Sequence, residues 1–160
     1  MSMGYQSAGI WKILEKQGYR IVGRHSAVKI CHWTREMLLN HRQCYKAKFY
    51  GIKSHRCIQM TPSVLWCEHR CIFCWRSVEY MLPPKLRDGN YDEPSKIVEG
   101  SIEMQKKLLS GYWGEIGRAT LKEVREANEP RHAAISLAGE PTNYPYINEL
   151  IEEFHRRNFT

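Results

Sequence analysis

The sequence predicts a parallel α/β fold, and three observations support this. Residues 57–61 alternate polar and apolar side chains and end at Pro62, a pattern typical of a β-strand. The apolar run at 133–138 is typical of a buried parallel strand. Apolar residues at helical spacing lie between these two stretches and after the second. Strand, helix, strand, helix is the order of a parallel α/β protein, and 160 residues suffice for one domain.

Two helical stretches are expected before the first of these strands. One ends at Gly18, a residue that commonly stops helices, and the other lies between residues 31 and 44. Their apolar residues at helical spacing are Ile10, Ile13, Leu14, Trp33, Met37 and Leu38.

Three further helices are expected after the first strand. Residues 82–94 are rich in Pro, Gly, Asp and Asn and predict a surface loop, and Ser95 can cap a helix that ends near Gly111. Thr120 and Glu123 form a capping box for a second helix, and Pro145 starts a third. A third parallel strand is then expected to begin at residues 158–160. The apolar faces comprise Val98, Ile102 and Leu109 in the first helix and Ile147, Leu150, Ile151 and Phe154 in the last.

Three cysteines follow the first predicted strand with the spacing C-x3-C-x2-C: Cys67, Cys71 and Cys74. Three thiolates on one loop can hold three irons of a [4Fe–4S] cluster. Since such clusters usually take four cysteines, the fourth iron stays open to a substrate. A zinc site is the alternative, although zinc prefers four ligands and the only nearby histidine, His69, lies inside the loop. A disulfide framework is less favoured, because cysteines so close together suit a metal better than cross-links.

A second set of cysteines is evenly spaced along the preceding segment. Cys31, Cys44 and Cys57 are separated by twelve residues each, which is not a zinc-finger pattern. Three isolated buried thiols are the alternative, because free cysteine packs well as a small apolar residue. The set leads directly into the first cysteine loop, and this favours a second metal site.

Positive charge is concentrated in the half of the chain that carries both cysteine sets. The formal net charge is +7; residues 1–76 contain 13 Lys and Arg against 3 Asp and Glu, and residues 77–160 contain 11 against 14. A basic surface beside the metal sites suits a polyphosphate substrate such as RNA, although a generic basic surface would give the same composition.

The C-x12-C-x12-C set followed by C-x3-C-x2-C resembles the radical S-adenosylmethionine (SAM) enzymes of wybutosine biosynthesis, the tRNA 4-demethylwyosine synthases. The resemblance runs through residues 18–26, 44–57 and 134–142 and covers the chain from about Gly18 onward. It implies a partial (β/α)6 barrel with its cluster at the C-terminal mouth of the strands. We therefore expect a cysteine-bearing extension at 1–56 and the first part of the barrel at 57–160. The form resembles the single-domain archaeal enzymes, and because members are longer we expect an N-terminal fragment.

The resemblance also implies a reaction. In this family the amino and carboxylate groups of SAM chelate the open iron, and one electron from the cluster cleaves SAM to a 5′-deoxyadenosyl radical. The enzyme, a carbon–carbon lyase, condenses pyruvate with N1-methylguanosine 37 of tRNA(Phe) to form 4-demethylwyosine. The implied cofactors are SAM and two [4Fe–4S] clusters. The implied partners are the tRNA, pyruvate and an electron donor such as a flavodoxin or ferredoxin, in the cytoplasm and without a membrane.

Individual residues take roles from this resemblance. Cys67, Cys71 and Cys74 would hold the SAM cluster, and Cys31, Cys44 and Cys57 the second cluster. Glu140 would bind the SAM amino group and Phe73 the adenine, although an ordinary turn and core packing would explain these two residues as well. Lys46 would form a Schiff base with the ketone of pyruvate. Lys48 and Lys53 are its chemical competitors, and all three lysines could instead lie at a solvated surface or contact tRNA phosphates.

Contacts with the RNA are less specific. Candidate phosphate contacts are Arg42, Lys53, Arg56 and Arg76. Core packing is favoured over base stacking for Trp66 and Trp75. Two other functions remain open, a different radical SAM enzyme and a non-enzymatic zinc-binding RNA module.

Overall fold

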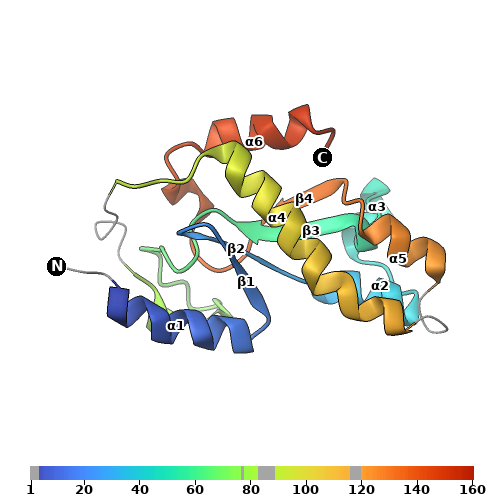
Figure 1. Cartoon of the computed structure of the whole chain (residues 1–160), viewed down its shortest axis with the longest axis horizontal. Helices are drawn as coiled ribbons and strands as arrows, with labels where there is room; N and C mark the ends of the chain where they lie inside the picture. The colour runs from blue at the N-terminus through green and yellow to red at the C-terminus, as the bar shows by residue number, and fades with distance from the viewer. Residues whose placement is uncertain (1–3, 77, 83–88, 116–119) are drawn as a thin grey trace.

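The computed structural model describes residues 4–76, 78–82, 89–115 and 120–160, and it confirms an α/β fold. Four strands form one sheet in the order β1-β2-β3-β4 (Figure 1). The strands are β1 (Tyr19–Val22), β2 (Ser26–Lys29), β3 (Cys57–Thr61) and β4 (His132–Ile135). The predicted strands are β3 and β4, and they pair in parallel with Cys57 opposite His132.

The hairpin of β1 and β2 was not predicted. The two strands are antiparallel, and β2 also pairs antiparallel with β3. Each strand has only four residues, and three successive residues of β2 are buried, so the alternation that identifies a half-buried strand is absent. The sheet therefore includes strands from both sides of residues 56 and 57. The division of the chain there into an extension and a barrel part stays a prediction.

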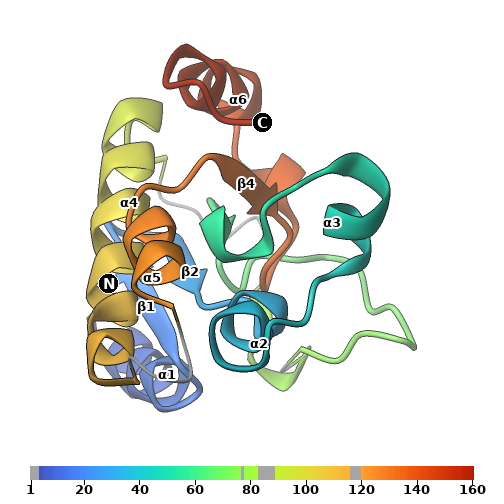
Figure 2. The same ribbon diagram turned by 90° about the vertical axis from the view of Figure 1, so that its right-hand side faces the viewer.

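Six helices surround this sheet in the described part of the chain. They are α1 (Gly4–Lys16), α2 (His32–Asn40), α3 (Tyr45–Tyr50), α4 (Pro94–Leu109), α5 (Leu121–Ala127) and α6 (Ile147–Arg156). Figure 2 shows α4 on one side of the sheet and α2 and α3 on the other. No helix within the described ranges is both long and apolar enough to cross a membrane.

The main core lies between the sheet and the helices α4 and α6. Ile58 and Met60 of β3 are fully buried there against Ile97 and Val98 of α4. Because successive side chains of a strand point to opposite faces, Cys57 and Gln59 face away from this core. The central strand thus anchors the fold with one face and lines the opposite side with the other.

Several helix boundaries confirm or correct the sequence analysis. The Thr120–Glu123 capping box is present. Ser95 is not a cap, because α4 already begins at Pro94 with Glu93 as its N-cap residue. Proline fits the first turn of a helix, where its missing N–H would have no helical partner. Ile151 was wrongly placed on the buried face of α6, since it is 39% exposed. Residues 83–88 of the predicted surface loop lie outside the described residues.

The strand β4 is half-buried rather than buried and lies at the edge of the sheet. Its outer edge pairs with the backbone of Thr160, which donates to the Arg131 carbonyl at 3.0 Å and accepts from the Ala133 amide at 2.8 Å. This alternation is the hydrogen-bond pattern of a parallel pair. The third strand expected at residues 158–160 therefore begins its pairing at Thr160.

A glycine brings the segment after β4 against the segment after β3. Gly139 has a φ of +95°, and a Cβ at this position would collide with the backbone carbonyl oxygen of Ser63. The contact is fixed on either side, because the Ser63 hydroxyl donates to the Glu140 carbonyl at 2.6 Å and the Glu140 amide donates to the Trp66 carbonyl at 2.8 Å. Only glycine satisfies both the conformation and the close approach.

We expect Gly139→Ala to lower the free energy of unfolding by about 2 to 4 kcal/mol, since it adds backbone strain and a collision with backbone. Urea denaturation followed by circular dichroism measures this loss. Gly111→Ala is the matched control, because a Cβ there meets nothing within 4 Å. A Gly139→Ala variant as stable as the control would contradict the proposed packing.

Candidate functional site

The second cysteine set converges on one cavity. Cys31, Cys44 and Cys57 all line a cavity of about 200 Å³, which Lys46 also lines. Cys31 and Cys44 are the N-cap residues of α2 and α3, and Cys57 is the first residue of β3. Three residues spread over 27 positions of sequence therefore meet at the sheet face opposite α4.

Hydrogen bonds fix the position of Cys44 in this cavity. The sulfur of this buried residue accepts from the Ala47 amide at 3.4 Å and from the Ser54 hydroxyl at 3.2 Å. The same hydroxyl accepts from the Cys44 amide at 3.2 Å, and the Thr34 hydroxyl holds the Ser54 carbonyl at 2.9 Å. Ser54 is a residue that the sequence analysis missed, because no local pattern links it to a cysteine ten positions earlier.

Titratable groups that line the cavity influence the pKa of Cys57. Burial, together with the neighbouring Cys31 and Cys44, raises the pKa of the Cys57 thiol to about 12, while Lys46 acts in the opposite direction. Three thiolates cannot share such a buried place without a compensating positive charge. A metal cluster would provide that charge.

The three cysteines of the second set are not arranged as ligands of a single metal ion. Within the described ranges, no three His, Cys, Asp or Glu side chains are close enough together to hold one metal ion. In a [4Fe–4S] cluster each thiolate binds a different iron, so its cysteines need to surround a shared space rather than one point. The three cysteines around the cavity satisfy this requirement.

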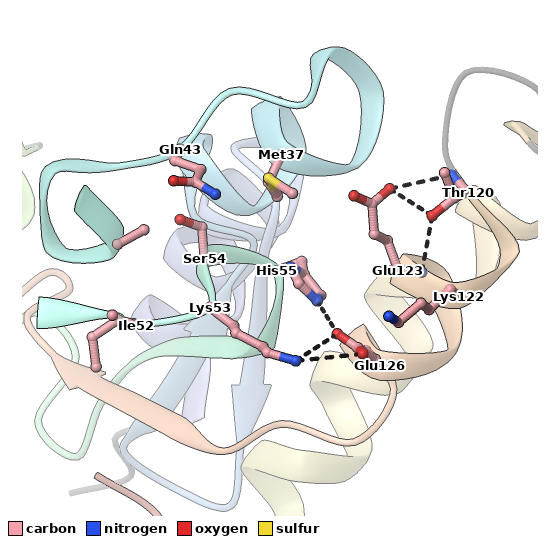
Figure 3. A pocket seen from close by; sticks show the side chains of 12 residues that line it. Met37, Gln43, Ile52, Lys53, Ser54, His55, Thr120, Lys122, Glu123 and Glu126 are labelled. Carbon is pink, nitrogen blue, oxygen red and sulfur yellow. Dashed lines mark hydrogen bonds and ion pairs between the residues drawn. The ribbon is translucent and has the colours of Figure 1, made fainter.

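The structure separates the three candidate lysines. Lys46 is half-buried and lines the cysteine cavity. Lys48 is exposed and lines a different depression beside Trp33. The ammonium group of Lys53 points into another cavity, of about 400 Å³, where it lies 3.3 Å from a carboxylate oxygen of Glu126 (Figure 3).

The first cysteine loop lies at the carboxyl ends of β3 and β4. Its start is fixed by Leu82, whose amide donates to the Leu65 carbonyl at 2.7 Å and whose carbonyl accepts from the Cys67 amide at 3.2 Å. The Cys74 amide donates to the Cys71 carbonyl at 2.9 Å, so the last two cysteines share one tight turn. Cys67 and Cys74 are half-buried, whereas Cys71 is exposed.

Glu140 lies close to this loop. Burial raises the pKa of the Cys67 thiol, and the carboxylate of Glu140 and the other two loop cysteines add to the increase. One carboxylate oxygen of Glu140, Oε1, accepts from the amide and hydroxyl of Thr142 at 3.1 and 2.8 Å. The other oxygen makes no hydrogen bond to a residue that the structure describes. Glu140 therefore caps a turn and also presents, beside the cysteines, a carboxylate oxygen that none of the described residues binds.

The aromatic residues of the loop differ in exposure. The core packing predicted for Trp75 is wrong, because its ring is 77% exposed. Phe73 is 82% exposed, which excludes core packing, the alternative to its predicted adenine contact. Trp66 is half-buried and packs on the ring of His25, with ring centroids 5.3 Å apart. The exposed rings lie where a bound molecule could contact them.

His25 is a second residue whose role the sequence analysis missed. Its buried ring donates from Nδ1 to the Pro62 carbonyl at 2.5 Å and accepts at Nε2 from the Asp92 amide at 2.9 Å. Both ring nitrogens are thus used by backbone groups, which defines the tautomer. The histidine joins the β1–β2 turn to the chain just before the cysteine loop. The only sequence signal for this residue was its place in residues 18–26, one of the segments that carry the family resemblance.

Known proteins resemble the chain over almost all of its length. It is 56% identical to the S-adenosyl-L-methionine-dependent tRNA 4-demethylwyosine synthase of Pyrococcus abyssi, over 92% of the chain and 43% of that protein. It is 49% identical to the enzyme of the same name from Methanocaldococcus jannaschii, over 94% of the chain and 49% of that protein. No protein-family model matches.

Solved structures agree with these relatives. A structure described as TYW1 with a lysine–pyruvate adduct bound superposes with a TM-score of 0.83 at 51% identity, over 95% of the chain and 49% of that protein. A crystal structure of archaeal TYW1 superposes with a TM-score of 0.79 at 45% identity. The chain spans about half the length of these relatives. The predicted resemblance is confirmed, and the chain is related to the tRNA 4-demethylwyosine synthases.

Proposed function

We propose that this chain provides the cluster-binding and pyruvate-binding part of a tRNA 4-demethylwyosine synthase. Such an enzyme condenses pyruvate with N1-methylguanosine 37 of tRNA(Phe). The observation that carries the proposal is the single cavity shared by Lys46 and the second cysteine set. The names of the relatives, which specify SAM dependence and 4-demethylwyosine synthesis, support the same activity.

The fold is that of a partial (β/α)6 radical SAM barrel. β3 and β4 are its first two strands, and the first cysteine loop and Glu140 follow their carboxyl ends. Reactive groups of α/β barrels lie at this end of the strands. The hairpin of β1 and β2 extends the same sheet and belongs to the cysteine-bearing extension.

The first cysteine loop would hold the SAM cluster through Cys67, Cys71 and Cys74. When bound, this [4Fe–4S] cluster supplies the electron that cleaves SAM. The free oxygen of Glu140 can accept a hydrogen bond from the SAM amino group, and the exposed ring of Phe73 offers a surface for the adenine. The contact between Gly139 and Ser63 keeps the carboxylate near the loop.

The second set, Cys31, Cys44 and Cys57, would hold another [4Fe–4S] cluster beside Lys46. The amine nitrogen of Lys46 attacks the ketone carbon of pyruvate, water leaves, and the resulting Schiff base holds the substrate in the cavity. Partial burial of the lysine limits hydrolysis of that bond. The lysine–pyruvate adduct named for the solved relative supports this assignment.

The remaining partners follow from the reaction. The methylated guanosine must leave the anticodon stack to reach the strand ends. The electron requires a donor such as a flavodoxin or a ferredoxin, and the enzyme would act in the cytoplasm.

The metal content of the chain tests the proposal first. After anaerobic reconstitution we expect about eight irons and eight sulfides per chain, because each cysteine set holds one [4Fe–4S] cluster. Cys67→Ala with Cys71→Ala should remove about half of the iron, and Cys44→Ala with Cys57→Ala the other half. Iron and sulfide analysis with the visible spectrum provides the measurement. Zinc without a visible chromophore would exclude the enzyme and leave a zinc-binding RNA module.

The thiols of the metal-free chain test the electrostatics of the second set. A thiol with its pKa near 12 is almost fully protonated at pH 8, and only the thiolate reacts. Iodoacetamide should therefore modify Cys57 at least about tenfold more slowly than the exposed Cys71. The rate at Cys57 should continue to rise above pH 9, as peptide mass spectrometry can show. A Cys57 rate that levels off near pH 9 would disprove the raised pKa.

The role of Lys46 has its own test. Lys46→Ala should retain both clusters and SAM cleavage but form no tricyclic base, because the Schiff base is lost. Borohydride should trap pyruvate on the wild-type chain and on the matched control Lys48→Ala, whose lysine lies outside the cavity. Mass spectrometry locates the adduct. Pyruvate trapped on the Lys46→Ala variant would remove this residue from the mechanism.

A further inference from the structure

The structure distinguishes Arg76 from the other basic residues that were candidates for phosphate contact. Those three already face carboxylates. Arg76 makes no ion pair with a carboxylate in the part of the chain that the structure describes. The three pairs are Arg42–Glu36, Lys53–Glu126 and Arg56–Glu129, at 3.4, 3.3 and 3.9 Å.

Arg76 instead shares a cavity with a second cation. Lys29, at the end of β2, and Arg76, just after the first cysteine loop, line a cavity of about 300 Å³. Tyr19, Trp75 and Gln17 complete its lining. Two cations, two aromatic rings and an amide thus surround one space, and no carboxylate of the described residues is among them.

The guanidinium of Arg76 is held in place but incompletely satisfied. It stacks on the ring of Trp75, with its central carbon 3.5 Å from the ring centroid, and its Nη1 donates to the Tyr19 hydroxyl at 3.0 Å. Its Nη2 is buried and has no hydrogen-bond partner among the residues that the structure describes. A buried donor without a partner costs about 1 to 3 kcal/mol, so an acceptor for Nη2 would be stabilising.

Lys29 lies against the same tyrosine. Its ammonium nitrogen is 4.9 Å from the centroid of the Tyr19 ring. Two like charges that line one cavity repel each other. An anion between them would remove this repulsion and accept hydrogen bonds from both side chains. Arginine and lysine together are a common pair for binding phosphate oxygens.

We propose that the Lys29–Arg76 cavity binds one phosphodiester group of an RNA substrate. The 77% exposed indole of Trp75 borders the cavity, and an exposed ring beside a phosphate site is the arrangement with which proteins bind unstacked nucleotides. Two lining residues, Trp75 and Arg76, directly follow Cys74 in sequence. The site would therefore hold RNA beside the first cysteine loop. The proposal rests on the proposed function, because it assumes that the substrate is an RNA.

The salt dependence of RNA binding tests the site. Fluorescence anisotropy of a labelled anticodon stem–loop RNA gives the dissociation constant at a series of KCl concentrations. Lys29→Gln with Arg76→Gln should weaken binding equally for the natural and a scrambled loop sequence. It should also reduce the slope of log affinity against log salt by about 1, since one phosphate contact is lost. Arg76→Lys keeps the charge and should keep most of that slope.

The matched control removes two exposed charges elsewhere. Lys106→Gln with Arg125→Gln changes α4 and α5, which do not line the cavity, and should leave the slope unchanged. Circular dichroism confirms that each variant is folded. If the wild-type chain binds RNA and the Lys29/Arg76 variant has an unchanged slope, the site is wrong while the proposed function stands. Inorganic phosphate that binds in the cavity without weakening RNA binding would likewise overturn the proposed site. A wild-type chain that binds no RNA would contradict both.

Discussion

The two-sided use of strand β3 is the constraint on which the rest of the structure depends. Hydrogen bonds to β2 and to β4 hold this strand in the middle of the sheet. Its pleat directs Ile58 and Met60 into the core below α4 and leaves Cys57 on the opposite face. A shift of register by one residue would exchange the two sets, so the packing of the core also determines where the cysteine is placed.

A few buried polar contacts position each of the two cysteine sets. His25 ties the β1–β2 turn to Pro62 and Asp92, and it supports Trp66 at the start of the first cysteine loop. Ser54 performs a similar role for Cys44 in the other set. Both contacts bring together residues from different strands or helices, so the geometry of the reactive groups depends on the complete sheet.

Sequence patterns predicted what depends on neighbouring residues. The capping box at Thr120 and the predicted helices depend on local patterns and were confirmed, whereas the short helix α3 was not predicted. The β1–β2 hairpin could not be predicted because its strands are too short and too buried to alternate. The hydrogen bond between His25 and Asp92 and the cavity shared by Lys29 and Arg76 involve residues more than forty positions apart, which only the folded chain brings together.

The cysteine cavity shares part of its lining with a second cavity that holds none of the six cysteines. Ile52 and Ser54 line both the cysteine cavity and the larger cavity below α5, so a wall only one residue thick divides them. Pressure on this wall from the α5 side would move a hydroxyl that is hydrogen-bonded to Cys44. A ligand bound in the larger cavity would therefore contact, from the other side, the same residue whose hydroxyl holds the sulfur of Cys44.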